Sequence, residues 1–334
     1  MSLNDIAKQM VTPGKGILAA DESTSTAGKR FVQINIENTE DNRRAYREML
    51  FTAPGLSEHI SGVILYDETF RQSASDGRKF TEVLGSQGIL PGIKVDEGLI
   101  EMPGSPAEKL TKGLEGLPAR LAEYASLGAK FAKWRNVITI GPGTPTEENL
   151  RENARIHAEY AKACQEAGIV PIVEPEVLMD GDHDIDACRD ASFKALTYAF
   201  EALNEKGVEI TGMILKTNMV VPGKGKRVAP AEEVAKETVA LFKKVLPDNL
   251  PGQAFLSGGM SDLDATANLD AMNKMGPFPW KLSFSYGRAL QDKPLKTWGG
   301  KAENVSAAQA ALLHRAKMNG LATLGQYDPS MEHA

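Results

Sequence analysis

The stretch Gly212-Met-Ile-Leu-Lys-Thr-Asn-Met-Val220 is an apolar, strand-like run that carries one lysine, Lys216, in its middle. An ammonium group among methyl and thioether side chains costs free energy unless the amine is paired or kept neutral. A neutral amine on a rigid strand is a nucleophile towards carbonyl carbon, so Lys216 is a candidate Schiff-base lysine. The alternative is a lysine that extends its head group into solvent from a strand end.

This run is one of eight strand-like segments that alternate with helical segments along the chain. The strands are expected at residues 16–21, 60–67, 92–96, 131–138, 169–176, 212–220, 255–259 (the seventh strand together with its exit loop) and 281–288. The helices are expected at residues 41–50, 105–127, 146–167, 185–206, 231–246, 261–275 and 303–319. Alternation of this kind indicates a parallel sheet with crossover helices, and eight units predict an α/β fold of the (β/α)8 TIM-barrel type. An open doubly wound sheet is the alternative, but it would require a glycine-rich first turn that this chain lacks.

The whole chain, residues 1–334, is expected to form a single barrel domain, because no low-complexity linker divides it. A short N-terminal helix is expected at about residues 2–11, and a polar C-terminal tail at about residues 322–334.

The composition of the chain argues against some classes of binding function and favours a cellular location. The net charge of -6 argues against a general nucleic-acid or membrane-surface binder, since either would need a broad basic face. The N-terminus lacks the apolar core of a signal peptide, and no run of 18 apolar residues follows it. With only Cys164 and Cys188 in the chain, a reducing compartment and a cytoplasmic protein are expected.

Charged side chains occur near the carboxyl ends of the expected strands, where barrels of this type carry their active sites. Residues two apart in a strand share a face. On this basis the expected inward-facing set consists of Asp21, Lys94, Asp96, Lys133, Arg135, Glu174, Glu176 and Lys216. Each buried ion costs on the order of several kcal/mol unless it is paired, so a barrel interior built only for stability would hold aliphatic side chains. A structural layer of ion pairs is the alternative.

Imine formation at Lys216 requires proton transfers at the carbinolamine oxygen, and Glu174 and Glu176 are the candidates for them. Asp21 can take or give a proton elsewhere on the substrate.

Two groups of residues are expected to bind anions. Ser257, Gly258 and Gly259 follow the seventh strand, and Gly287 and Arg288 follow the eighth, at places where such barrels frequently bind phosphate. A second cluster is expected on the opposite side, and it consists of Ser23, Thr26, Lys29, Arg30 and Arg43. A solvated loop is the alternative for the second cluster. Two anion sites that flank an imine-forming lysine indicate a sugar phosphorylated at both ends.

No metal site is expected. The acidic run at residues 180–186 does not fit a calcium loop, because Ile185 and Ala191 stand at the places of the required glycine and acid. A loop with helix-capping acids is the favoured role for this run. The histidines support no zinc cluster, and His183 is expected to be a surface or hydrogen-bonding residue.

Taken jointly, the motifs of this chain resemble those of the class I fructose-1,6-bisphosphate aldolase family. The likeness runs from about residue 14 to residue 321. It rests on the motifs Gly16-Ile-Leu-Ala-Ala-Asp-Glu-Ser-Thr24, Glu37-Asn-Thr-Glu40, Gly92-Ile-Lys-Val-Asp96, Phe131-Ala-Lys-Trp-Arg135, Val170-Pro-Ile-Val-Glu-Pro-Glu176, Asp180-Gly-Asp-His-Asp184, Leu215-Lys216, Phe255-Leu-Ser-Gly-Gly259 and Phe284-Ser-Tyr-Gly-Arg-Ala-Leu290.

The resemblance implies roles for the catalytic candidates. Lys216 is expected to form the Schiff base with the ketose, and Glu174 to be the acid-base group of dehydration. Asp21 and Lys133 are expected to assist carbinolamine formation and carbon-carbon cleavage, with Glu176 supporting Lys216. The implied reaction is the reversible cleavage of fructose 1,6-bisphosphate into dihydroxyacetone phosphate and glyceraldehyde 3-phosphate, without metal or cofactor.

The resemblance also implies how the phosphates are bound. One phosphate is expected at Ser257, Gly258 and Arg288. The residues expected towards the other phosphate are Ser23, Lys29, Arg30, Arg43, Lys94 and Arg135. Because relatives are often tetramers, a homo-oligomer is expected, with no nucleic-acid or membrane partner.

Two features depart from the family pattern. Thr217 stands where the family commonly has proline after the imine lysine, and a small effect is expected. Many members end in a tyrosine that folds over the site, whereas this chain ends in Ser330-Met-Glu-His-Ala334 and its nearest tyrosine is Tyr327. The tail is therefore expected to be dispensable for cleavage. The alternatives to an aldolase are a transaldolase-like barrel enzyme that acts on sugar monophosphates and a non-catalytic scaffold.

Overall fold

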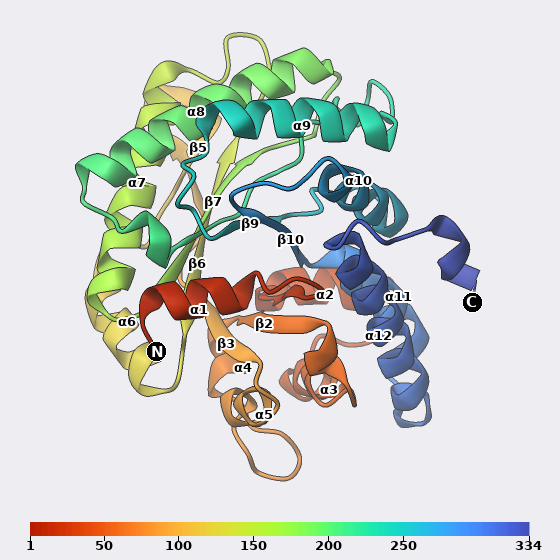
Figure 1. The fold of residues 1–334 in the computed structure, drawn as a ribbon. Helices are drawn as coiled ribbons and strands as arrows, with labels where there is room; N and C mark the ends of the chain where they lie inside the picture. The colour runs from red at the N-terminus through yellow and green to blue at the C-terminus, as the bar shows by residue number, and fades with distance from the viewer. Residues whose placement is uncertain (334) are drawn as a thin grey trace.

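The computed structural model describes residues 1–333, and eight parallel strands close into a barrel at its centre (Figure 1). The barrel strands are β1 (Gly16–Ala20), β2 (Ile60–Leu65), β3 (Leu90–Lys94), β6 (Phe131–Ile138), β7 (Val170–Val177), β8 (Ile214–Leu215), β9 (Gly252–Phe255) and β10 (Lys281–Tyr286). Their order around the barrel is β1-β10-β9-β8-β7-β6-β3-β2, so each strand pairs with its neighbours in the chain and the last pairs with the first. The predicted (β/α)8 fold is confirmed.

Helices cover the outside of the barrel, as Figure 1 shows. They are α2 (Thr24–Val32), α3 (Glu40–Phe51), α4 (Asp67–Arg71), α5 (Phe80–Ser86), α6 (Leu117–Ser126), α7 (Glu147–Glu166), α8 (Ile185–Glu205), α9 (Ala231–Val245), α10 (Asp262–Lys274), α11 (Arg288–Trp298) and α12 (Val305–Ala322), with the short 3-10 helices η1 (Leu56–Glu58), η2 (Ile210–Gly212), η3 (Ala302–Asn304) and η4 (Pro329–His333). Within residues 1–333, no helix combines the length and the apolar character needed to cross a membrane.

An apolar plug fills the amino-terminal end of the barrel. It is built by side chains from the starts of the strands and by α1 (Leu3–Met10), and its members include Ile6, Met10, Ile17, Ile64, Phe131, Ile172 and Ile214. The N-cap of helix α1 is Ser2, whose hydroxyl accepts from the backbone amide of Asp5. A Cβ atom at Gly92 would lie 2.2 Å from the ring of Phe131, so glycine is required there. The plug leaves the carboxyl end of the barrel to polar residues.

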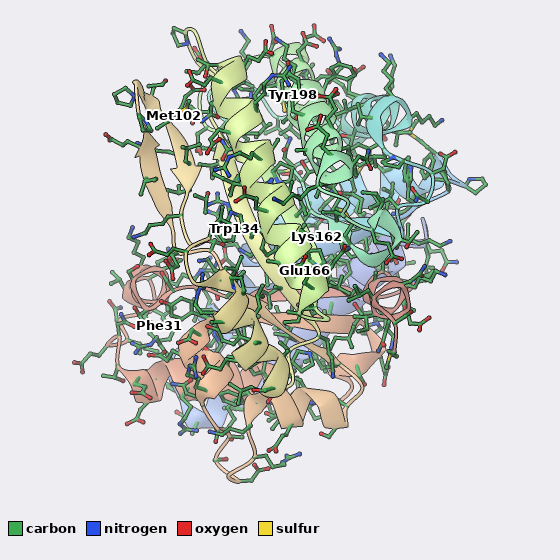
Figure 2. All side chains as sticks on the ribbon, turned by 90° about the vertical axis from the view of Figure 1, so that its left-hand side faces the viewer. Phe31, Met102, Trp134, Lys162, Glu166 and Tyr198 are labelled. Atoms are coloured by element: carbon green, nitrogen blue, oxygen red, sulfur yellow. The ribbon has the colours of Figure 1, made fainter. Side chains whose placement is uncertain are left out.

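The helix expected at residues 105–127 is wrong in its first half. β4 (Leu99–Met102) and β5 (Ser105–Thr111) form an antiparallel hairpin there, and α6 begins only at Leu117. The hairpin turns at Gly104, which has a φ of 81°, and Gly113 and Gly116 also have positive φ. A right-handed helix excludes these φ values. Figure 2 shows the hairpin, marked by Met102, standing beside α7.

Strand β8 is shorter than the apolar run suggested, because it is confined to Ile214–Leu215 and η2 precedes it. The amide of Lys216 still donates to the carbonyl of Val173 on β7, at 2.8 Å. Beyond it, side chains replace the backbone ladder on the β7 side: the Thr217 hydroxyl donates to the carbonyl of Pro175 at 3.0 Å. Lys216 therefore stands at the carboxyl end of β8.

The eighth strand also ends earlier than expected, since Arg288 begins α11. The acidic run at residues 180–186 forms a loop in which Asp184 caps α8 through a bond from the amide of Ala187.

Candidate active site

A cavity of about 870 Å³ opens at the carboxyl ends of the barrel strands. Every strand, or the loop that follows it, contributes to its lining. The lining includes the predicted residues Asp21, Ser23, Thr26, Arg30, Lys94, Lys133, Arg135, Glu174, Glu176, Lys216, Ser257, Gly258, Gly287 and Arg288. Closure of the barrel brings these residues together from segments far apart in the sequence.

Four groups, three of them buried and one half-buried, form a continuous chain of contacts across the floor of the cavity. Nζ of Lys216 lies 3.1 Å from Oε1 of Glu174, and Nζ of Lys133 lies 3.3 Å from Oε2 of the same carboxylate. On its other side, Nζ of Lys133 lies 2.8 Å from Oδ2 of Asp21. Each carboxylate therefore contacts a lysine, and Glu174 contacts two.

The charges in this chain control its ionisation. Burial alone would raise the pKa of Glu174, but the charges of Lys216 and Lys133 more than offset this and hold the pKa below its ordinary value. Burial would also raise the pKa of Asp21, but nearby positive charges, above all that of Lys133, outweigh it and strongly lower the pKa. Burial would lower the pKa of Lys133, but Asp21 and Glu174 raise it well above the ordinary range. At neutral pH the floor thus carries two carboxylates and a firmly protonated Lys133.

A second set of ion pairs lies beside this chain. Nε of Arg135 donates to Glu176, and Nζ of Lys94 lies 2.7 Å from Oδ1 of Asp96. Glu176 was expected to support Lys216, whereas its carboxylate contacts Arg135 in the structure. Its position on β7, two residues beyond Glu174, points it towards the cavity rim.

The anion cluster after β9 and β10 lies at the cavity wall. Ser257, Gly258, Gly287 and Arg288 line it, while Gly259 lies just beyond. The guanidinium of Arg288 makes no hydrogen bond or ion pair with any residue in the described part of the chain, so it is open to an anion.

The cluster after β1 is only partly at the cavity. Ser23, Thr26 and Arg30 line it, but Lys29 and Arg43 do not. Lys29 is exposed on α2. The guanidinium of Arg43 is held away from the cavity by Glu68, with Nε 2.7 Å from Oε1.

The expected position of this cluster, opposite the Ser257 to Arg288 group, is also wrong. β1 is the direct neighbour of β10 in the closed barrel, and a Cβ atom on Gly287 would lie 3.7 Å from Nη2 of Arg30. The strands that face β9 and β10 across the barrel are β3 and β6, which carry Lys94 and Arg135. The cations on opposite sides of the cavity are therefore Arg288 on one side and Lys94 and Arg135 on the other.

Sequence reasoning missed Glu22, which lines the cavity wall next to Asp21. Its carboxylate lies 2.7 Å from Nη1 of Arg30 and 2.5 Å from Nη2 of Arg47, and it accepts from the amide of Gln291 at 2.9 Å. An acid next to Asp21 was visible in the sequence. Its partners on α3 and α11 were not, because only the fold brings them to the end of β1.

The described residues, 1–333, contain no group of three or more His, Cys, Asp or Glu side chains placed to hold a metal ion. The most buried histidine, His157, packs under β6, and burial lowers its pKa to about 3, so it is neutral.

The fold and the site together define a class of protein. A buried lysine beside an ionised carboxylate, in the mouth of a (β/α)8 barrel with cations on facing strands, is the arrangement of a lyase that acts on a phosphorylated carbonyl compound through an imine. The family model described as fructose-bisphosphate aldolase class-I, a glycolytic family, matches residues 2–334, and the chain belongs to this family.

Individual relatives agree with this assignment. The chain is 53% identical over 327 residues to a probable fructose-bisphosphate aldolase class 1 of Xanthomonas campestris, covering 97% of this chain and 98% of the relative. It is 52% identical over 322 residues to the cytosolic fructose-bisphosphate aldolase 5 of Arabidopsis thaliana, covering 96% and 90%.

A solved structure gives the same result. It is that of fructose-bisphosphate aldolase from Plasmodium falciparum in complex with TRAP and a small-molecule inhibitor. The chain matches it with a TM-score of 0.96 at 47% identity, covering 98% of this chain and 95% of that one. The protein is therefore a metal-independent lyase that reversibly splits fructose 1,6-bisphosphate into dihydroxyacetone phosphate and glyceraldehyde 3-phosphate through a lysine Schiff base, as the sequence motifs implied.

Proposed function

We propose that Lys216 is the lysine that forms the Schiff base in this reaction. The cavity contains three lysines, and two of them are poor nucleophiles. Lys133 is held protonated by Asp21 and Glu174, and Nζ of Lys94 is bound both to the carboxylate and to the carbonyl of Asp96, each at 2.7 Å. Lys216 is buried and contacts a single carboxylate, that of Glu174, at 3.1 Å. This contact is the observation that carries the proposal.

Glu174 is the proposed acid-base group, because its ionisation is coupled to the charge on Lys216. When the amine adds to the ketone of the substrate, the resulting carbinolamine nitrogen is neutral. The largest influence that lowers the pKa of Glu174 then disappears, so the carboxylate becomes more basic and can keep the proton that the Lys216 ammonium gave up to become the attacking free amine. Glu174 can donate this proton to the carbinolamine hydroxyl, which leaves as water and yields the iminium.

Asp21 and Lys133 are proposed to act on the substrate oxygens. Lys133, which stays protonated, can stabilise negative charge on the oxygen as the carbinolamine forms. Asp21 stays ionised, so it can remove the proton of the hydroxyl at C4 while the C3-C4 bonding electrons flow into the iminium. The result is an enamine on Lys216 and a free aldehyde.

The two phosphates are proposed to bind on opposite sides of the cavity. Ser257, Gly258, Gly287 and Arg288 would hold one of them. Lys94 and Arg135, on the facing strands, would hold the other, with Ser23, Thr26 and Arg30 on the wall between the two. Glu176 is proposed to position Arg135 through their ion pair.

A cytoplasmic location and a homotetrameric state are also proposed. Relatives from Arabidopsis thaliana and Spinacia oleracea that carry cytosolic or cytoplasmic in their names support the location. The tetramer rests on the family likeness, and sedimentation equilibrium of the purified protein tests it.

Borohydride reduction in the presence of dihydroxyacetone phosphate tests the central proposal. The expected result is one reduced adduct on the peptide that contains Lys216 and none in the K216M variant. The matched control is K226M, which removes an exposed lysine ten residues further on and should still be labelled at Lys216. An adduct on Lys133 or Lys94, or cleavage activity in K216M, would refute the assignment.

A further inference from the structure

A further cation, Lys224, reaches the glycine loop after β9 from the loop that follows β8. A Cβ atom built on Gly259 would lie 2.6 Å from Nζ of Lys224 and 3.1 Å from Nη2 of Arg288. The two cations thus converge on one residue of the loop Ser257-Gly258-Gly259. Like charges at short range repel one another, so this arrangement is favourable only when an anion lies between them or beside both.

The backbone of Lys224 is fixed by close docking between two loops. The amides of Gly223, Lys224 and Gly225 donate to carbonyls within residues 179–183 at 2.9, 2.8 and 2.7 Å. A Cβ atom on Gly223 would lie 2.5 Å from the carbonyl oxygen of Gly181, so only glycine permits this approach. The glycines on both sides of Lys224 therefore fix the backbone from which its side chain reaches the β9 loop.

The present partner of Lys224 is weakly bound. Nζ of Lys224 lies 3.2 Å from Oδ1 of Asp180, and the two side chains are 41% and 70% exposed. Exposed ion pairs of this kind contribute little, because water screens them. An ammonium group has three donors, so Lys224 keeps hydrogen-bonding capacity for an anion at the glycine loop.

We propose that Lys224 is a further phosphate-binding residue, which completes the site formed by Ser257, Gly258 and Arg288. The inference rests on the proposed function, since that site takes a substrate phosphate there. Asp180 holds the ammonium group beside the glycine loop and competes with phosphate for it. Consequently, removing Lys224 weakens phosphate binding, and removing the charge of Asp180 strengthens it.

The opposite signs of these two effects provide the test. The concentration of dihydroxyacetone phosphate that half-saturates borohydride trapping is measured for the wild-type protein, K224M and D180N. K224M is expected to raise it about five- to tenfold, the size of one partly exposed charge-assisted hydrogen bond. D180N is expected to lower it. Trapping with unphosphorylated dihydroxyacetone should not change in either variant.

The matched control is K226M, which removes the same charge from the same loop. Lys226 is exposed and forms no ion pair among residues 1–333, so its loss should change half-saturation by less than about twofold. If K224M and D180N shift half-saturation in the same direction, Lys224 and Asp180 are only a structural ion pair and the inference fails. It also fails if K226M matches K224M, or if unphosphorylated dihydroxyacetone is affected equally.

Titration with inorganic phosphate in a calorimeter separates this inference from the proposed imine chemistry. K224M is expected to weaken phosphate binding by a similar factor whether or not Lys216 traps a ketone. If the wild-type protein traps no ketone, the proposed role of Lys216 is refuted but that of Lys224 is not. If K224M binds phosphate as tightly as the wild-type protein, the proposed role of Lys224 is refuted but that of Lys216 is not.

Discussion

Glu174 contacts two lysines, one on each oxygen, and in the proposed mechanism only one of them changes its charge. Lys133 is held protonated by Asp21 and Glu174, whereas in the proposed mechanism Lys216 is neutral once it has added to the ketone. The proposed first chemical step therefore changes the charge that lies 3.1 Å from Oε1 of Glu174, on Nζ of Lys216. This coupling requires no movement of the protein, since the change in charge on Lys216 by itself shifts the pKa of Glu174.

The coupling predicts that K216M raises the pKa of Glu174, because the variant removes the largest of the charges that lower it. Titration of carbon-13-labelled glutamate carboxylates by NMR measures the shift. K226M should leave the titration of Glu174 unchanged. If the pKa of Glu174 falls or stays constant in K216M, the proposed transfer of a proton through Glu174 has no driving force.

Two of the arginines that the sequence predicted to bind phosphate are expected to behave differently on substitution. R288M should raise KM for fructose 1,6-bisphosphate about tenfold, with a smaller effect on kcat, because an unpaired guanidinium at the cavity is lost. R43M should leave KM unchanged, since Arg43 binds Glu68 outside the cavity. Steady-state kinetics measure both values. Equal effects of the two substitutions would contradict the placement of Arg43.

At the scale of elements, the sequence predicted those helices and strands whose formation depends on the local spacing of apolar and charged residues. Strand β6 was evident because its apolar residues alternate with the inward-facing Lys133 and Arg135. The hairpin of β4 and β5 was missed because the leucines at helical spacing in the following segment suggested that the helix began earlier. The positive φ values of Gly104 and Gly116, which exclude a helix there, are set by the turns and cannot be read from residue spacing. The length of β8 was overestimated, since side-chain bonds replace its ladder on the β7 side.

The candidate site was predictable where residues share one strand and less so where strands meet. Lys133 and Arg135 were placed correctly from their spacing. The position of the loop after β1 was wrong because closure of the barrel sets β1 beside β10, which spacing does not reveal. The partners of Glu22 were missed for the same reason.

Thr217 carries a prediction about the end of β8. T217V should lower the free energy of unfolding by about 1 kcal/mol, because the buried carbonyl of Pro175 loses its hydroxyl donor. T217S keeps the hydroxyl and should lose less. Urea denaturation measures both. A T217V variant as stable as the wild-type protein would show that the hydroxyl does not hold the strand end.

At the scale of the whole molecule, the two chain ends lie on different parts of the barrel. Helix α1 closes the amino-terminal end, whereas the C-terminal segment lies on the outside against α10 and α12 (Figure 1). Glu332 anchors this segment: its carboxylate accepts from Arg315, lies 3.0 Å from Nε2 of His314, and accepts from the hydroxyl of Tyr327 at 3.0 Å. Tyr327 is thereby engaged away from the cavity, which none of these residues line.

The anchoring predicts a tail that stabilises the fold without taking part in cleavage. Deleting residues 328–334 should change kcat by less than about twofold, but lower the free energy of unfolding by about 1 to 3 kcal/mol, because buried Arg315 loses its carboxylate partner. Activity assays and thermal unfolding, with E332Q as the matched full-length control, measure the two effects. A large loss of cleavage rate in the folded deletion variant would contradict the prediction.

The same anchor predicts the dependence of stability on pH. Burial alone would raise the pKa of Glu332, but hydrogen bonds from Arg315 and His314 outweigh it and hold the pKa below its ordinary value of 4.5. A carboxyl group with a lowered pKa in the folded state contributes its stability above the ordinary value and loses it as the pH falls through the folded value. The difference in unfolding free energy between the wild-type protein and E332Q should therefore be full at pH 7 and shrink below about pH 4.5. Chemical denaturation across this range measures it, and a difference that grows towards acid pH would show that Glu332 is not the ionised anchor of the tail.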